Sequence, residues 1–357
     1  MEQKVKAAVV GLGVGMAHAK GYLACPDTDL YAICDSDTVR LQERGDELNI
    51  PLERRFSAID QLLALPELDA ISIGLPNFLH APTAIAAFKA GKHVLCEKPL
   101  ATSALEAQAM VDAAHKAGKY LMVCFNYRFR EDARWLKSLQ EEGKFGNLYF
   151  AKAGWLRNIG IPGRGWFIQK KLSGGGPLID LGVHVLDLTL WLMGYPKVVS
   201  VSGTTFAEFG PRGKKTWGKM SGDTVYDVED LAAGFVRFDN GTSLLLETSW
   251  ASHTKPGRDD FFVTLYGSEG GSDLYVANYT DRDTVNFYTE TKNKAVKIKP
   301  PSRVMKAGGH EMAVAHFAEC IQQGHAPEAS GEQGLTLMRL IDGIYESART
   351  GREIRYD

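Results

Sequence analysis

The chain has 357 residues, of which 45% are hydrophobic and 24% are charged. Single hydrophobic cores stop growing at about 250–300 residues, so this length favours two domains. The 41 Lys and Arg residues are balanced by 43 Asp and Glu residues, giving a formal net charge of −2. No overall basic field exists to attract nucleic acid or an anionic membrane, and a small-molecule partner is therefore favoured.

The cysteines and the first residues of the chain indicate a cellular compartment. The five cysteines form no C-x-x-C pair and mostly lie in apolar runs, as reduced core residues do. Residues 1–4 lead directly into a short apolar run rather than a signal sequence, and no apolar run approaches the roughly 20 residues that span a bilayer. We expect a cytoplasmic protein with no membrane partner.

Residues 4–125 alternate short apolar runs with amphipathic ones. The apolar runs are Val5–Val10, Leu30–Cys34, Ala70–Leu75, His93–Cys96 and Tyr120–Phe125. The amphipathic stretches are Met16–Ala24, Asp37–Leu48, Ala81–Ala90 and Ser103–Lys116. This alternation is typical of a parallel sheet with crossover helices, and continuously apolar strands indicate a sheet covered on both faces. Residues 1–125 are predicted to form a doubly wound, Rossmann-type NAD-binding domain.

Residues 126–357 follow a different pattern, in which long strands dominate. The predicted elements are a helix at Glu131–Glu142, a strand at Leu148–Trp155, a helix at Asp180–Leu192, and strands at Leu231–Phe238, Thr242–Trp250, Phe261–Tyr266, Ser272–Ala277 and Thr284–Thr289. Asn240-Gly241 between two of these strands is a strong hairpin signal. An α/β protein is therefore expected, whose second domain is α+β with a large, mainly antiparallel open sheet for substrate binding and oligomerisation.

Two features of the second domain leave alternatives open. The Asp180–Leu192 helix can cover one face of the sheet, and the other face is a candidate subunit interface unless the late helices Glu311–Gln323 and Gln333–Arg349 cover it. The polar segment 207–230 is rich in Gly and Lys. We favour a solvated loop there over a substrate lid or an interface arm.

A glycine-rich turn follows the first predicted strand. Its sequence is Gly11-Leu12-Gly13-Val14-Gly15-Met16. Glycines at a strand-to-helix turn let the backbone approach a pyrophosphate, and the helix N-terminus offers N–H groups and a positive dipole end. Met16 stands where the third glycine of G-x-G-x-x-G falls, which weakens the motif without removing the phosphate turn.

Asp35, at the end of the second predicted strand, supports dinucleotide binding. An acid here, 20 residues after Gly15, can accept hydrogen bonds from the adenosine ribose hydroxyls and repels a 2′-phosphate. Asp37 adds a second negative charge, whereas Arg40 leaves room for NADP. NAD is the favoured cofactor and NADP the less favoured one. The alternative for Asp35 is a helix N-cap, and one residue can fill both roles.

Two further strand ends are predicted to face the same crevice. Leu75-Pro76-Asn77-Phe78-Leu79-His80 follows the third apolar run, and Glu97-Lys98-Pro99 follows the fourth. Ligands of open α/β sheets bind at the carboxyl ends of the strands. Lys98 has little freedom before a proline, so it serves better as a positioned charge than as a solvent-facing side chain.

The stretch from Gly174 to Leu188 places three polar groups in apolar surroundings. If it is helical from about Pro177, Asp180, His184 and Asp187 share one face. Buried carboxylates and imidazoles are costly unless partnered or used. The alternatives are a structural Asp–His pair, or an Asp187 that caps a neighbouring group.

These motifs together resemble the Gfo/Idh/MocA family of oxidoreductases. The resemblance rests on Gly11-x-Gly13, Pro76-Asn77-x-x-His80, Gly91-Lys92-His93-Val94-Leu95-Cys96-Glu97-Lys98-Pro99 and Gly174-Gly175-Gly176-x-x-x-Asp180-x-Gly182-x-His184-x-x-Asp187. It covers essentially the whole chain. It implies reversible NAD(P)-dependent oxidation of a secondary alcohol on a sugar, inositol or related polyol, and a homodimer or homotetramer formed through the second domain.

The resemblance also implies roles for single residues. Lys98, Asp180 and His184 carry the chemistry: His184 is the general base, Asp180 orients a hydroxyl or the imidazole, and Lys98 stabilises alkoxide charge. Asn126 is similar to a family position near the nicotinamide amide. Arg157 and Trp166 are candidate sugar contacts, because Arg donates to hydroxyls and aromatic faces stack on sugar C–H surfaces.

Three other functions are weighed against this one. A dinucleotide-sensing regulator of the same fold does not need Lys98, Asp180 and His184 together. An NAD-dependent glycosidase oxidises its sugar only transiently, so it releases an aglycone without net NADH. A zinc site at Asp180, His184 and Asp187 lacks a convincing third-ligand pattern and the usual Cys and His richness, so no metal is expected.

Overall fold

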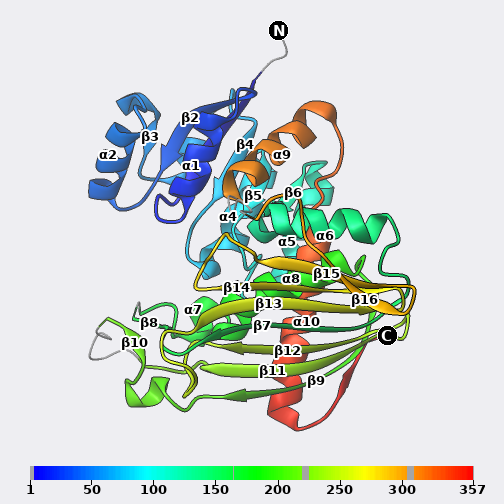
Figure 1. The fold of residues 1–357 in the computed structure, drawn as a ribbon. Coiled ribbons are helices and arrows are strands. Elements are labelled where there is room, and N and C mark those ends of the chain that lie inside the picture. Colours follow the sequence, from blue (N-terminus) through cyan, green and yellow to red (C-terminus); the bar gives the residue numbers. More distant parts are fainter. Residues whose placement is uncertain (1–3, 164, 219–224, 304–308, 357) are drawn as a thin grey trace. The chain divides into compact units, whose positions relative to one another are not determined.

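The protein is described by a computed structural model, which covers residues 4–163, 165–218, 225–303 and 309–356 (Figure 1). The chain folds into two compact units. The first unit comprises Met1–Asn126 and Gly308–Met338, and the second comprises Tyr127–Ala307 and Arg339–Asp357. A late segment of the chain therefore completes the N-terminal unit.

The first unit contains a six-stranded parallel sheet in the order β3-β2-β1-β4-β5-β6. The strands are β1 (Val5–Val10), β2 (Thr28–Cys34), β3 (Arg55–Phe56), β4 (Ala70–Ile73), β5 (His93–Cys96) and β6 (Leu121–Val123). Strand order reverses beside β1, which makes the sheet doubly wound. All four residues of β4 are buried, as the continuously apolar pattern predicts. The predicted Rossmann-type sheet is confirmed.

Helices cover this sheet. They are α1 (Gly15–Ala24), α2 (Thr38–Glu47), α3 (Ile59–Leu63), α4 (His80–Lys89), α5 (Ala104–Ala117) and α9 (His310–Gln323). Ser103 caps α5 by accepting a hydrogen bond from the Glu106 N–H, and Gly118 ends it in the left-handed conformation. Helix α9 packs on α1, and the residues after it reach β6, where the Val123 N–H donates to the Ala329 carbonyl.

The second unit contains a nine-stranded sheet in the order β16-β15-β14-β13-β7-β12-β11-β9-β17 (Figure 1). Its strands are β7 (Leu148–Arg157), β9 (Val198–Phe206), β11 (Leu231–Phe238), β12 (Ser243–Ser249), β13 (Asp259–Gly267), β14 (Gly270–Ala277), β15 (Val285–Thr291), β16 (Lys294–Ile298) and β17 (Ile354–Arg355). Neighbours are antiparallel except β7 and β12. The hairpin predicted at Asn240-Gly241 joins β11 and β12, with Gly241 at φ +83°.

The helices of this unit are α6 (Glu131–Glu141), α7 (Lys170–Ser173), α8 (Val183–Leu192) and the part of α10 (Gly331–Thr350) that follows Met338. Both α8 and α10 cover one face of the sheet. Gly182, at the start of α8, lies against Thr248, and Ile344 of α10 lies against Gly234. Thr248 and Gly234 point to the same face, because Gly234 pairs with Leu246, two residues before Thr248.

The opposite face of the sheet carries exposed apolar side chains. Leu245 is 43% exposed, Tyr275 46% and Tyr288 36%. The late helix α10 does not cover these residues, since it lies on the face with α8. A sheet face of this kind is suited to burial against another surface.

The described part of segment 207–230 contains more structure than the expected solvated loop. Strand β10 (Thr216–Trp217) pairs with β8 (Ile161–Pro162), and the buried Asp230 carboxylate accepts hydrogen bonds from the Phe209 and Gly210 N–H groups. Residues 219–224 lie outside the described residues. Among the helices that the structure describes, none is long and apolar enough to cross a bilayer.

Candidate active site

The turn between β1 and α1 divides its three glycines by task. Gly11 has φ +86°, and a Cβ there would lie 2.6 Å from the Gly74 carbonyl oxygen. A Cβ on Gly15 would lie 2.8 Å from a Val9 methyl group, so Gly15 permits close packing of helix on strand. A Cβ on Gly13 would meet nothing within 4 Å. The first and third glycines are therefore required by the fold, and the space at Gly13 fits the close approach of a pyrophosphate.

Met16 does not spoil this turn, because Gly15 has taken over the packing task of the usual third glycine. Helix α1 starts at Gly15 and has no side-chain cap and no acidic residue in its first turn. The start of this ten-residue helix is uncapped, so it presents free N–H groups and a positive dipole end to an anion. The residues present thus fit the phosphates of a dinucleotide.

Asp35 is 5% exposed and supports the glycine turn directly. Its Oδ2 accepts the Leu12 N–H at 2.8 Å, and its Oδ1 accepts the Asp37 N–H at 2.9 Å. Arg40 donates to both oxygens, at 3.1 and 3.4 Å. The N-cap of α2 is Asp37, not Asp35. Asp35 is therefore not a helix cap, and its predicted contact with a ribose stays a prediction.

The segment from Leu75 to His80 is held by the His80 ring, which is fully buried. Its Nδ1 lies 2.8 Å from the Pro99 carbonyl oxygen, and its Nε2 lies 2.9 Å from that of Leu75. Burial lowers the pKa of His80, against the effect of the two carbonyl groups. His80 joins two strand-end loops, and Asn77 beside it is also buried.

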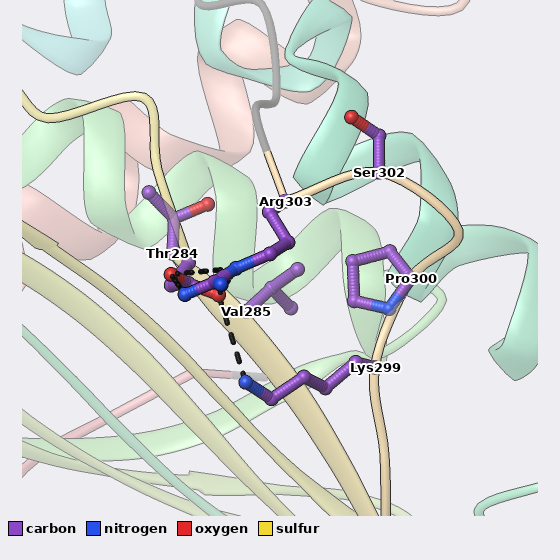
Figure 2. A pocket seen from close by; sticks show the side chains of 7 residues that line it. Thr284, Val285, Lys299, Pro300, Ser302 and Arg303 are labelled. Atoms are coloured by element: carbon purple, nitrogen blue, oxygen red, sulfur yellow. Dashed lines mark hydrogen bonds and ion pairs between the residues drawn. The ribbon is translucent and has the colours of Figure 1, made fainter.

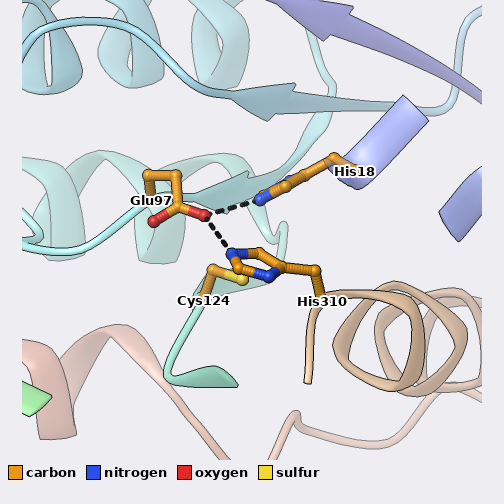
Figure 3. A group of neighbouring side chains, drawn as sticks. All are labelled: His18, Glu97, Cys124 and His310. Carbon is orange, nitrogen blue, oxygen red and sulfur yellow. Dashed lines mark hydrogen bonds and ion pairs between the residues drawn. The ribbon is translucent and has the colours of Figure 1, made fainter. Parts of the chain in front are cut away.

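Glu97 and Lys98 follow β5, and the Lys98–Pro99 peptide bond is cis. Glu97 is 4% exposed, and its Oε1 lies 2.8 Å from His18 Nε2 and 3.2 Å from His310 Nε2 (Figure 3). Lys98 is half-buried in the same unit. The sequence pattern did not reveal His310, which stands more than 200 residues from Glu97 at the start of an amphipathic helix.

Asn126 begins a short 3₁₀ segment, Asn126–Phe129, after β6. Its carbonyl oxygen lies so close to Gly309 that a Cβ at position 309 would overlap it. Residues at the start of α9 therefore support Asn126, within the same unit. Its predicted place near a nicotinamide amide stays a prediction.

In the second unit, the Gly-rich stretch forms a tight turn into a helix. Gly174 has φ +88°, and side chains at Gly175 and Gly176 would overlap Tyr345 and Glu229. The buried Glu229 carboxylate accepts the Gly176 N–H at 2.9 Å and the Leu178 N–H at 3.0 Å, and the Tyr345 hydroxyl donates to it at 2.9 Å. Burial raises the pKa of Glu229, against the effect of the two N–H groups. Neither Glu229 nor Tyr345 belongs to a recognisable motif, so the sequence did not indicate this support.

Asp180 and His184 lie in and just after this turn. Residues Leu178–Gly182 form a π-helical turn that continues into α8. Asp180 accepts a hydrogen bond from Trp250 Nε1 at 2.9 Å. The His184 ring is 9% exposed and lies 4.7 Å from the Tyr127 ring and 5.6 Å from the Trp155 ring, between centroids. π turns occur often at functional sites.

Asp187 belongs to a different network. Its carboxylate forms a bidentate ion pair with Arg128, at 2.6 and 2.9 Å. It also accepts a hydrogen bond from the Tyr195 hydroxyl at 2.7 Å. Both partners of the ion pair are almost fully buried. The regular α-helical face predicted for Asp180, His184 and Asp187 is interrupted by the π turn, and Asp187 is a structural partner of Arg128.

Beside His184, aromatic and charged side chains gather at the end of β7 and the start of β13, two central strands of the sheet. Asp259 accepts the Trp155 Nε1 hydrogen at 2.7 Å and Arg157 Nε at 3.1 Å. Arg157 also donates to the Tyr279 hydroxyl at 2.6 Å, and the Trp217 ring lies 4.5 Å from its guanidinium carbon. Arg157 is thus held at the end of β7, in the unit that contains His184. Trp166, the other predicted sugar contact, stacks on Phe167.

A separate hollow lies beside β15 and does not belong to this group (Figure 2). Its volume is about 40 Å³, which holds only a few water molecules. Asp283, at its wall, pairs with Arg303 at 2.6 Å and with Lys299 at 3.6 Å. The pocket is too small for a sugar ring.

A doubly wound parallel sheet with an open glycine turn is typical of dinucleotide-binding proteins, and the second unit carries Asp180 and His184 over the face of a large sheet. Two family models match the chain. "Oxidoreductase family, NAD-binding Rossmann fold" matches residues 5–125, and "Oxidoreductase family, C-terminal alpha/beta domain" matches residues 137–356. The chain belongs to this Gfo/Idh/MocA oxidoreductase family, and is a dehydrogenase-type enzyme.

Named relatives span almost the whole chain. D-glucoside 3-dehydrogenase of Escherichia coli K12 is 31% identical over 357 residues, covering 98% of this chain and 97% of that protein. D-xylose 1-dehydrogenase (NADP(+)) 2 of Haloferax volcanii is 27% identical, covering 97% of each. The structure of levoglucosan dehydrogenase in complex with NADH and levoglucosan superposes with a TM-score of 0.85 at 24% identity, covering 99% of both chains. This last likeness shows the shared fold.

Proposed function

We propose that the protein is an NAD-dependent dehydrogenase that reversibly oxidises a secondary alcohol of a sugar, inositol or related cyclic polyol. The observation that supports the proposal is the placement of Asp180 and His184. Asp180 lies in the glycine-rich turn that the Glu229 carboxylate supports, and the His184 ring lies beside the Trp155 ring, which Arg157 also contacts. Oxidation of an alcohol requires a base for the hydroxyl proton while the hydride leaves for the nicotinamide. His184 is that base in this proposal.

The other catalytic groups act on charge and orientation. Asp180 accepts from Trp250 Nε1, which fixes its carboxylate while it orients a substrate hydroxyl or the imidazole. Lys98 stabilises the negative charge that develops on the alcohol oxygen as the proton leaves. Its participation is taken from the family resemblance, since Lys98 belongs to the first unit and His184 to the second. Bound NAD supplies the hydride acceptor.

Asp35 is the reason for preferring NAD to NADP. Its buried carboxylate at the end of β2 repels a 2′-phosphate, and Asp37 adds charge nearby. The positive charge of Arg40 does not favour a 2′-phosphate, because two carboxylates neutralise it. Its guanidinium pairs with Asp35 at 3.1 Å and with Asp37 at 2.9 Å. We assign dinucleotide contacts to residues 11–16, Asp35, residues 75–77, His80, Glu97, Lys98 and Asn126.

A sugar or polyol suits the groups beside His184. Arg157 can donate to hydroxyls, and the Trp155 and Tyr279 rings lie 6.0 Å apart, between centroids. Trp166 is a further proposed sugar contact. The E. coli relative is named for a D-glucoside and the NADH-bound structure for levoglucosan, which supports a sugar ring as substrate class.

Association into homodimers or homotetramers through the exposed sheet face is part of the proposal. Leu245, Tyr275 and Tyr288 would be buried by a second copy. A cytoplasmic location is part of the proposal, because the five cysteines are free thiols.

The test is nicotinamide absorbance at 340 nm on mixing the protein with NAD or NADP and a panel of inositols, monosaccharides, glycosides and anhydrosugars. We expect NAD to be reduced with one class of sugar. The His184→Asn variant should lower kcat about 100-fold or more, because it removes the base. The exposed His253 of the same unit is the matched control, and His253→Asn should leave kcat unchanged.

Three results would count against the proposal in different ways. Free aglycone without net NADH would indicate the glycosidase chemistry of the same family. NAD binding without turnover of any sugar would favour the sensing function. Equal kcat values for His184→Asn and the wild type would remove His184 from the base role.

A further inference from the structure

Four side chains from distant parts of the chain meet at the end of β5 in the first unit (Figure 3). His18 comes from α1, Glu97 follows β5, Cys124 follows β6, and His310 opens α9. One donor atom of each lies within 4.8 Å of the others. His310 is the most exposed of the group, with 28% of its side chain accessible, whereas His18 is fully buried.

Glu97 is the centre of this cluster and is ionised. Burial opposes ionisation, but hydrogen bonds from His18 and His310 hold the pKa of Glu97 well below its usual range. Cys124 contributes a thiol hydrogen bond, and burial beside the carboxylate raises the pKa of that thiol. The two histidines therefore act as N–H donors to a buried anion.

The same carboxylate connects the cluster to the proposed active site. Glu97 Oε1 accepts hydrogen bonds from the two histidines, and Oε2 accepts one from the backbone N–H of Lys98 at 3.1 Å. A carboxylate bound on both oxygens is fixed in rotation, so the peptide that carries Lys98 is fixed with it. The direction of the Lys98 side chain is thereby linked to His310.

The donor types also suit a zinc ion, and distance decides between the two arrangements. Ligands around tetrahedral zinc lie about 3.3 Å or more apart, given bonds of about 2.0–2.1 Å to His and carboxylate atoms. The two His–Glu97 contacts are 2.8 and 3.2 Å, which are hydrogen-bond distances and leave no place for an ion between them. The geometry is that of a hydrogen-bonded network.

We propose that His310 is a positioning residue of the enzyme, which acts through Glu97 to hold the Lys98 peptide. Helix α9 is thus part of the cofactor and catalytic apparatus, although it comes from the far end of the chain. Loss of the His310 donor leaves the carboxylate with fewer partners, and it then shifts or draws in water. The Lys98 N–H loses its fixed acceptor in either case.

Hydrogen–deuterium exchange of the Lys98 amide tests this link without any turnover. His310→Leu should accelerate exchange in the peptide that contains Lys98 by about tenfold or more, because its acceptor is no longer held. His310→Gln keeps a donor N–H and should restore most of the protection. The matched control is His316→Leu on the same helix, where the ring accepts the Glu328 N–H and does not reach Glu97.

The second measurement rests on the proposed function and uses the sugar that the panel identifies. His310→Leu should lower kcat about tenfold or more while the KM for NAD changes little, since a displaced Lys98 affects the transition state. His310→Gln should recover kcat, because its amide still donates to Glu97. Its pH profile should match that of the wild type, because His310 exchanges no proton with the substrate in this proposal. If no sugar of the panel is oxidised, the hydrogen–deuterium exchange measurement alone decides whether His310 holds the Lys98 peptide.

Three outcomes would overturn the inference. Unchanged Lys98 exchange in His310→Leu would show that His310 does not hold this peptide. Exchange that rises equally in His316→Leu would reduce the effect to the stability of α9. Stoichiometric zinc found by elemental analysis of the purified protein, with slower Lys98 exchange on metal addition, would replace the hydrogen-bonded network by a metal site.

Discussion

Single residues in α8 show how one helix serves two purposes. His184 contacts aromatic rings at the proposed substrate side, whereas Asp187, three residues later, is closed off by Arg128 and Tyr195. The sequence supports both interpretations for each residue, because apolar neighbours surround both. The buried ion pair with Arg128 identifies Asp187 as a group that stabilises the fold.

Asp187→Asn should lower the free energy of unfolding by about 3–5 kcal/mol, because it leaves the buried Arg128 guanidinium without its counter-charge. Urea unfolding followed by circular dichroism measures this. The control is Glu346→Gln, which removes a carboxylate from an exposed Arg349 pair and should cost at most about 1 kcal/mol. Equal losses in both variants would contradict the structural role of Asp187.

Glu97 gives a pH dependence of known sign. The pKa of Glu97 is lowered in the folded state, so its ionised form contributes stability that is fully present above the unfolded pKa of about 4.3. This contribution is lost as the pH falls from there toward the folded pKa. The melting temperature of Glu97→Gln should therefore lie below that of the wild type at pH 5, and the gap should narrow below about pH 4.3. A gap that stays constant would show that the carboxylate is not stabilised in its ionised form.

At the scale of elements, the sequence predicted the parts with a regular period well. Strands β1 and β5 have the expected boundaries, and the Asn240-Gly241 hairpin is present. The π turn at Leu178–Gly182 was not expected, because apolar spacing does not distinguish a π turn from an α-helix. Supports that come from distant segments, such as Glu229 and His310, could not be predicted either, since no local pattern records which segments meet.

The glycine turn allows its folding and binding tasks to be separated. Gly13→Val adds a side chain in open space, so it should leave the melting temperature nearly unchanged and weaken NAD binding at least about tenfold by obstructing the pyrophosphate. Gly15→Val should lower the melting temperature, because its side chain collides with Val9. Calorimetric titration with NAD and thermal unfolding measure the two effects. Equal behaviour of the two variants would contradict this division of tasks.

At the scale of the whole molecule, each of the two units has its own sheet. The large sheet leaves one face with exposed apolar side chains, and the helices of its unit, α8 and α10, lie on the other. Burying apolar surface contributes roughly 25 cal/mol of stabilisation per Å², so association through such a face is favourable. From the sequence alone, this face could be either a subunit interface or a surface covered by the late helices, because the sequence does not reveal where the last helix packs.

Leu245→Lys combined with Tyr275→Lys should shift the protein toward monomers, because two charges would have to be buried in the interface. Light scattering after size-exclusion chromatography measures the mass. The control is Met312→Lys, an exposed position on α9 in the other unit, which should leave the mass unchanged. An unaltered mass for the double variant would place the interface elsewhere.

The return of residues 308–338 to the first unit affects how the protein is made. N-terminal domains generally fold first as they leave the ribosome. Here β6 needs the Ala329 carbonyl and Glu97 needs His310, so residues 1–126 lack part of their core until nearly all of the chain has been synthesised. The Rossmann-type unit therefore cannot finish folding, and its sheet edge stays incomplete, until most of the second unit has been translated. Until then, its unpaired strand edge and exposed apolar surface favour aggregation.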